Sequence, residues 1–253
     1  MLRRPVLLVI AHGSRDPRHA ATVHALVARV RSLRPGLRVE TGFLDFNAPA
    51  VPQVLEGLAA EGVRDVVALP LLLTRAFHAK ADIPAVLHEA SARLPRLRIH
   101  QAEVLGPSPL LLTALERRLY EAGLIPGDKG STGVVLASAG STDPEAIAVI
   151  AEIARELRYT GWCAVRPAFA SASLPRTQDA VRLLRAAPEV RRVAVAPYVI
   201  APGFLPDRIA RGARESGAEV VGDVLGASSE VARLLLTRYD EARVPVRLAA
   251  VSA

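Results

Sequence analysis

Three side chains that could bind a metal ion or move a proton follow three apolar runs of the sequence. His12 comes directly after the run at residues 6–11, Asp45 follows a run that ends at residue 44, and His78 lies in the loop beyond the run at 65–73. Imidazole and carboxylate groups are ligands for divalent transition metals, and imidazole is also a base near neutral pH. His12, Asp45 and His78 are therefore the first candidates for a chemical site.

The elements that must position these residues alternate between strands and helices. The apolar runs are short and show no polar alternation, which is typical of parallel strands covered on both faces. A helix begins after the first run, with Asp16 as its N-cap and Pro17 as its first residue. The other elements expected in this half are a strand at 37–44, a strand at 97–101, and helices at 51–58, 83–94 and 109–122.

The carboxyl ends of parallel strands meet at one edge of a sheet, and ligands of such folds bind in the crevice outside that edge. His12, Asp45 and His78 all follow strands, so all three are expected at this edge. If the first strand lies between the second and the third, with neighbours about 4.8 Å apart, the three side chains can converge on one site.

The sequence repeats itself. Four residues of the first half recur 127 positions later, namely Gly13, Ser14, Asp16 and Pro17 as Gly140, Ser141, Asp143 and Pro144. The second copy has Ala139 in place of His12 and Ser171 in place of Asp45, and it has no histidine opposite His78. The three groups are absent together while the turn and helix-start residues persist. This pattern indicates chemistry rather than packing at His12, Asp45 and His78.

We therefore predict an α/β protein with two tandem, duplicated, doubly wound domains, each with a mainly parallel sheet of about four strands flanked by helices. Residues 1–125 form the domain with the active-site residues, 126–133 a glycine-rich linker, and 134–253 a degenerate repeat. The internal duplication favours a monomer.

Composition narrows the function classes. No run approaches the roughly 18 apolar residues of a membrane span, and the N-terminus leads straight into the first strand, so we expect no membrane partner and a cytoplasmic location. The formal charge of +7 comes almost entirely from arginines scattered along the chain, with few aromatic residues among them. This argues against nucleic acid as the partner, while an anionic small molecule fits arginine side chains and most of the arginines are expected to reflect genome composition alone.

Several short motifs together resemble the sirohydrochlorin chelatase family, the class II tetrapyrrole chelatases, in their two-domain form. They are AHGSR at 11–15, FLD at 43–45 followed by Pro49, FH at 77–78 followed by Lys80, and DIP at 82–84. The resemblance implies a chelatase-like fold and insertion of Fe²⁺ or Co²⁺ into sirohydrochlorin, in siroheme or cobalamin biosynthesis. It implies no permanently bound cofactor, because the metal is a substrate.

By this resemblance His12 and His78 match the two active-site histidines of the family, which present the metal and accept pyrrole protons. Asp45 stands where many members have glutamate, and is expected as a third metal ligand or proton acceptor. The carboxylates of the substrate would meet cations near the site, and a flat ligand could pack on an aromatic ring. The substrate-binding residues expected on these grounds are Ser14, Arg15, Arg75, Phe77 and Lys80.

Other interpretations remain open. A metal or tetrapyrrole carrier without turnover would need the same ligands. A non-haem iron oxygenase also uses two histidines and a carboxylate, but usually on antiparallel barrels, and a phosphohydrolase is disfavoured because Ala11 stands where a phosphate-binding arginine is expected. The ligand types do not discriminate iron from cobalt or nickel. The remaining histidines are expected to be structural or solvated, namely His19, His24, His88 and His100.

Overall fold

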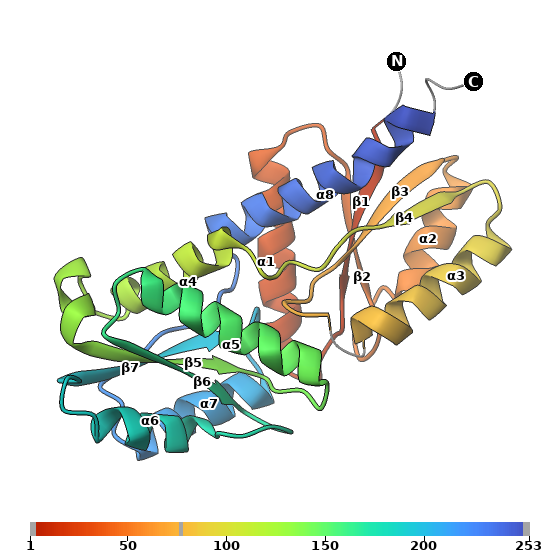
Figure 1. The fold of residues 1–253 in the computed structure, drawn as a ribbon. Helices are drawn as coiled ribbons and strands as arrows, with labels where there is room; N and C mark the ends of the chain where they lie inside the picture. The colour runs from red at the N-terminus through yellow and green to blue at the C-terminus, as the bar shows by residue number, and fades with distance from the viewer. Residues whose placement is uncertain (1–3, 76–77, 250–253) are drawn as a thin grey trace. The chain divides into compact units, whose positions relative to one another are not determined.

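The computed structural model describes residues 4–75 and 78–249 of the 253-residue chain. Within these residues the strands form two four-stranded sheets in which all paired neighbours run parallel (Figure 1). The first sheet contains β1 (Val6–Ala11), β2 (Val39–Phe43), β3 (Asp65–Pro70) and β4 (Arg98–Gln101). The second contains β5 (Thr132–Ser138), β6 (Ala164–Phe169), β7 (Arg192–Tyr198) and β8 (Val220–Val221). The predicted α/β class and the two parallel sheets are confirmed.

The first sheet has the strand order β2-β1-β3-β4, so β1 lies between β2 and β3 as predicted. Ala11, the last residue of β1, faces Phe43 of β2, and Ile10 faces Pro70 of β3. All six residues of β1 are buried, because helices cover both faces of the sheet. Each fully buried Leu or Val contributes about 1.5–3 kcal/mol to the stability of such a strand.

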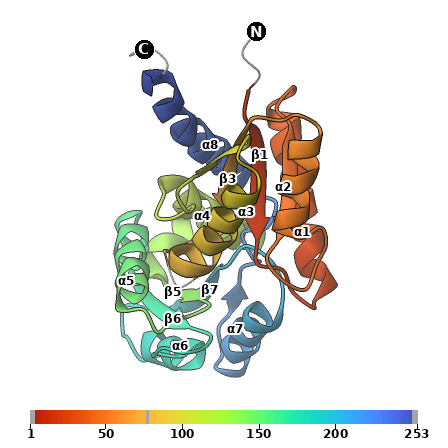
Figure 2. The same cartoon turned by 90° about the vertical axis from the view of Figure 1, so that its right-hand side faces the viewer.

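Helices cover the first sheet on both sides. On one face α2 (Val51–Ala60) and α3 (Ile83–Arg93) pack on alternate residues of β1 and β3. On the other face α1 (Pro17–Leu33) contacts β2, and α8 (Ser229–Ala249) contacts β3 and α1. Figure 2 shows β1 and β3 between α8 and α2. Asp16 caps α1 as predicted, since its Oδ1 accepts the N–H of Arg18 at 2.9 Å and Pro17 is the first helical residue.

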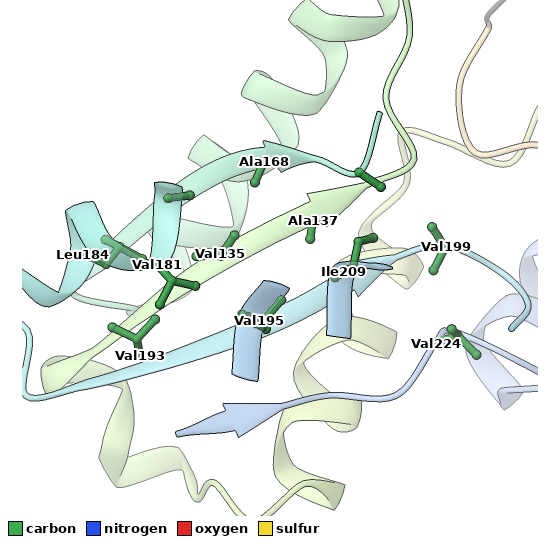
Figure 3. Packing of buried hydrophobic residues seen from close by; sticks show 13 residues of the cluster. Val135, Ala137, Ala168, Val181, Leu184, Val193, Val195, Val199, Ile209 and Val224 are labelled. Atoms are coloured by element: carbon green, nitrogen blue, oxygen red, sulfur yellow. The ribbon is translucent and has the colours of Figure 1, made fainter. Parts of the chain in front are cut away.

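The second sheet repeats this arrangement with the order β6-β5-β7-β8. One face is covered by α6 (Thr177–Arg185) and α7 (Phe204–Glu215), and the strands on the other face contact α5 (Pro144–Tyr159) and α4 (Pro109–Glu121). Figure 3 shows side chains of this core, in which Val135 and Val195 of the strands pack with Val181 and Leu184 of α6 and Ile209 of α7.

The last helix of each repeat packs on the sheet of the other repeat. One compact unit, the first unit, combines the chain up to Gly106 with α8, and the second unit runs from Pro107 to Ser228 and includes α4. The expected domains 1–125 and 134–253 follow the sequence repeat, and the compact units differ from them at the ends. The apolar face of a helix shows that the helix packs on a core, but the sequence does not show which of the two sheets it packs on.

The expected linker at 126–133 is also different. Pro126–Ser131 forms a 3₁₀-helix, and β5 begins at Thr132. The Oδ2 of Asp128 accepts the N–H of Ile125 at 2.9 Å, and the carbonyl of Lys129 accepts the N–H of Cys163 at 2.9 Å. These bonds hold a segment that composition alone would describe as flexible.

Polar contacts fix α8 within the first unit. Arg34, the C-cap residue of α1, donates two hydrogen bonds to the carboxylate of Asp240, both at 2.7 Å. The Tyr239 hydroxyl donates to the carbonyl of Pro5 at 2.7 Å, and Nε of Arg238 donates to the carbonyl of Val104 at 2.9 Å. Helix α8 is thus hydrogen-bonded to the residue before β1 and to the segment after β4. None of the helices in the described residues has the length and apolar character needed to cross a membrane.

We expect a fragment of residues 1–129 to lack a cooperative unfolding transition, because the face of β1 and β3 that α8 covers would be exposed to water. A chain in which 106 and 229 are joined by a Gly/Ser linker, without 107–228, should unfold cooperatively in urea followed by circular dichroism. The joined chain with Leu235→Asp is the control that should fail, because Leu235 is fully buried. Cooperative unfolding of the 1–129 fragment would contradict the exchange of helices.

Candidate functional site

His12 and Asp45 lie on adjacent loops at the carboxyl edge of the first sheet. The hydrogen-bond pairing of β1 with β2 continues beyond the strands, since Leu44 N–H donates to the carbonyl of Ala11 at 3.0 Å and Asp45 N–H donates to that of His12 at 2.9 Å. His12 is half-buried and Asp45 is exposed. The backbones of His12 and Asp45 are therefore adjacent, as predicted.

Gly13 allows the two loops to approach this closely. Its φ is +96°, and a Cβ at this position would lie 1.9 Å from the carbonyl oxygen of Asp45. The next residue, Ser14, donates its N–H to Oδ1 of Asn47 at 2.8 Å. Only glycine fits here, because any side chain would overlap the Asp45 carbonyl and would require a left-handed backbone.

The Asp45 carboxylate is part of the turn it starts. Its Oδ1 accepts the N–H of Phe46 at 2.8 Å, and its carbonyl accepts the N–H of Asn47 at 2.7 Å. Asp45 was expected as a metal ligand or proton acceptor. One oxygen of this exposed carboxylate is engaged in fixing the loop.

Phe46 is a residue that sequence reasoning missed. Its side chain is 51% exposed, and its φ is +60°. The ring centroid lies 6.3 Å from that of His12, and the guanidinium carbon of Arg15 lies 5.2 Å from the Phe46 centroid. The only signal in the sequence is a bulky apolar residue inside a predicted loop.

The segment that carries His78 is described only in part. The backbone from His78 to Asp82 forms a π-helical turn that leads into α3, where a loop was expected. Phe77 lies outside the described residues, and so does the side chain of His78. The convergence of His78 on His12 and Asp45 stays a prediction.

The predicted substrate-binding residues have different surroundings. Ser14 Oγ accepts the N–H of Asp16 at 3.0 Å, so the hydroxyl helps to start α1. Arg75 pairs with Glu103, with Nε 3.0 Å from Oε2. Lys80 is exposed and lines, with Arg75 and Glu103, a pocket of about 250 Å³ beyond the carboxyl end of β4. Arg75 and Lys80 thus lie near one another on the edge that carries His12.

Other histidines of the first unit have structural surroundings, as expected. Burial lowers the pKa of His19, and the nearby His12 lowers it further. His19 is therefore neutral at pH 7 and adds no second positive charge beside His12. His24 packs edge-on against Phe43, with centroids 5.8 Å apart.

The second unit keeps the backbone of this site without its side chains. Gly140 has a φ of +98°, and a Cβ there would lie 2.0 Å from the carbonyl oxygen of Ser171. Ser171 N–H donates to the carbonyl of Ala139 at 3.0 Å, and Ala172 has a φ of +58°. Ala139, Ser171 and Ala172 thus occupy the places of His12, Asp45 and Phe46 on the same turn.

The connection after the third strand differs between the units. It spans residues 71–82 in the first unit and only 199–203 in the second. The turn that begins at His78 has no counterpart in the shorter connection. The two units therefore differ at the carboxyl edges of their sheets, both in these side chains and in the length of the connection after the third strand.

Among the described side chains, no three histidine, cysteine, aspartate or glutamate residues lie close enough together to hold a metal ion. The described candidate site therefore consists of His12 and Asp45, with Arg15 and Phe46 beside them. The His78 side chain is the missing member of the predicted triad, and it is not among those described.

Comparisons with known proteins agree with the duplication. The CbiX family model matches residues 6–122 and again 133–242. A sirohydrochlorin cobaltochelatase of Priestia megaterium is 30% identical over 206 residues, covering 80% of this chain and 66% of the relative. A sirohydrochlorin ferrochelatase of the same organism is 28% identical over 205 residues, covering 80% of this chain and 76% of the relative.

Solved structures share the fold. The structure described as SirB from Bacillus subtilis with Fe³⁺ has a TM-score of 0.83 and 24% sequence identity, and the match covers 94% of this chain and 95% of that one. The two-unit architecture is therefore one that solved structures contain.

We expect Gly13→Ala and Gly140→Ala each to lower the free energy of unfolding by about 2–3 kcal/mol, because each added Cβ overlaps a carbonyl oxygen in a left-handed turn. Urea titrations measure this loss. Gly57→Ala on α2 is the control, since a Cβ there has no atom within 4 Å. That change should stabilise the protein by roughly 0.5–1 kcal/mol. Wild-type stability of Gly13→Ala would refute the close approach.

Proposed function

Since the chain belongs to the CbiX family, we propose that it is a sirohydrochlorin chelatase, an enzyme that inserts Fe²⁺ or Co²⁺ into sirohydrochlorin. One observation carries the proposal: His12 and Asp45 are held together on interlocked loops in the first unit, while the same loops of the second unit have Ala139 and Ser171. The curated relatives named above, which are sirohydrochlorin chelatases by name, support the choice of reaction.

The reaction exchanges two protons for a metal ion. The free tetrapyrrole carries two pyrrole N–H groups, and M²⁺ replaces both protons, so two H⁺ leave for each metal inserted. The chain must deliver the metal to the nitrogens and accept protons from them. A neutral imidazole does either, since it is a borderline ligand for Fe²⁺ and Co²⁺ and a base near pH 7.

We assign these tasks to His12 and His78. His12 is half-buried at the end of β1, which limits its rotation while leaving part of the ring accessible. His19 nearby is neutral because burial and His12 lower its pKa, so His19 adds no positive charge that would repel a cation from His12. Weak binding suits the reaction because the ion must leave the protein for the macrocycle.

Asp45 supplies the negative charge in this proposal. One carboxylate oxygen accepts the Phe46 N–H, so the side chain is oriented before a metal arrives. The carboxylate then serves as the third metal ligand or as a proton acceptor.

The peripheral carboxylates of sirohydrochlorin need cationic partners. Arg15, Arg75 and Lys80 lie at the carboxyl edge, and arginine forks match carboxylates. Arg75 already pairs with Glu103, so a substrate carboxylate would compete with that pair. We also retain Ser14 and Phe77 as substrate-binding residues on the strength of the motifs that contain them.

We further infer one site per chain, carried by the first unit of a monomer. The duplication supports this, since one chain already contains both copies of the fold. Nitrogen and oxygen ligands accept both iron and cobalt, so the choice between siroheme and cobalamin biosynthesis depends on metal supply.

Anaerobic mixing of the protein with sirohydrochlorin and either Fe²⁺ or Co²⁺ tests the proposal through the absorption spectrum of the pigment. We expect many metallated products per chain, and His12→Ala and His78→Ala should each lower the rate about 100-fold or more. His88→Ala, on the exposed face of α3, is the control. Thermal melting of the variants should stay within a few degrees of wild type.

A stoichiometric product that never exceeds one per chain would instead identify a metal or tetrapyrrole carrier. A large loss of thermal stability in His12→Ala with the rate retained would make His12 a structural residue.

Asp45→Asn separates the charge of this side chain from its role in the turn. The amide oxygen still accepts the Phe46 N–H, so the loop is kept while the negative charge is lost. We expect metallation to slow about tenfold or more, and Asp45→Glu to be tolerated. Asp65→Asn, at the start of β3, is a matched control at the opposite edge of the sheet. A wild-type rate in Asp45→Asn would reduce Asp45 to a loop residue.

A further inference from the structure

We propose that Phe46 is a substrate-binding platform, on which the flat face of the tetrapyrrole rests while Arg15 pairs with one of its carboxylates. The inference rests on the proposed function and names residues that select the substrate. It starts from an exposed aromatic ring that lies close to both an imidazole and a guanidinium group.

The backbone at Phe46 argues against a role in packing. The turn gives Phe46 a φ of +60°, a conformation that bulky residues rarely adopt and that glycine or asparagine adopts readily. Half of the side chain is exposed, so burial of the ring does not compensate for this conformation.

The second unit shows that the turn does not need an aromatic residue. Ala172 has nearly the same φ, +58°. Its neighbours make the hydrogen bonds of the turn: Ser171 donates its N–H to the Ala139 carbonyl, and Ser173 Oγ accepts the N–H of Ser141. The aromatic ring is thus present only on the turn that also carries His12 and Asp45. A purely structural requirement would apply to both turns.

The surroundings of the ring fit a planar anion. The Arg15 guanidinium lies 5.2 Å from the Phe46 centroid, and the His12 ring lies 6.3 Å away with a tilt of 33°. An exposed ring offers a surface for an offset stack, and guanidinium binds carboxylate in a fork. A conjugated macrocycle with carboxylates on its rim uses both contacts at once and brings its face next to the His12 imidazole.

A second role for Phe46 must be distinguished from this one. Its ring could hold the His12 imidazole in place without touching the substrate. A platform affects binding of the tetrapyrrole, whereas a positioning residue affects the rate of metal insertion after binding.

The test compares Phe46→Ala, Phe46→Trp and the control Tyr159→Ala in the full-length chain. Tyr159, at the C-terminal end of α5, is an aromatic residue with 87% exposure. Metal-free sirohydrochlorin is titrated by absorbance, and KM and kcat are measured with Co²⁺. We expect Phe46→Ala to weaken binding and raise KM about tenfold, with kcat within about twofold. Phe46→Trp should retain binding, and Tyr159→Ala should match wild type.

Unchanged binding in Phe46→Ala overturns the platform, and so does a lower kcat at constant KM. If Phe46→Ala does not fold, Phe46→Gly gives the same comparison, because glycine adopts the positive φ without strain. The metal-free titration keeps the two proposals separate. A wild-type chain that binds sirohydrochlorin without inserting metal refutes the chelatase activity, while the loss of binding in Phe46→Ala still supports the platform.

Discussion

The site depends on the close approach of two backbones at Gly13 and Asp45. Because residue 13 has no side chain, the loop after β1 lies against the carbonyl of Asp45, and hydrogen bonds continue past the ends of both strands. This approach fixes the spacing of the His12 and Asp45 backbones through main-chain hydrogen bonds. It also shapes the turn in which Phe46 is exposed beside Arg15.

The second unit has the same loop backbone without the side chains that could carry out chemistry. Gly140 and Ser171 make the same close approach, and the same hydrogen bonds close the turn. The side chains that could bind a metal or a flat ligand are replaced by Ala139, Ser171 and Ala172. The turn therefore forms without these functional groups.

The parallel sheets, the order β2-β1-β3 and the edge that carries His12 and Asp45 follow from patterns that the sequence displays directly: apolar runs, the Asp16-Pro17 helix start and the repeat spacing. Other features do not. The periodicity of α8 shows an apolar face but not its partner sheet, the 3₁₀-helix at Pro126–Ser131 depends on bonds from Asp128 and Lys129, and no residue pattern predicts a left-handed Phe46. Each of these is decided by contacts between residues distant in sequence or by a turn that its neighbours impose.

The exchange of α8 determines the order in which the units can be completed during translation. The second unit is one continuous segment, whereas the first requires residues on both sides of it. At about 5–20 residues per second, the ribosome needs on the order of 10 s to pass from the end of β4 to the start of α8. During that interval the first sheet has emerged without the helix that covers β3 and β4 on one face, and the unit that carries His12 is completed only after the whole second unit has been synthesised.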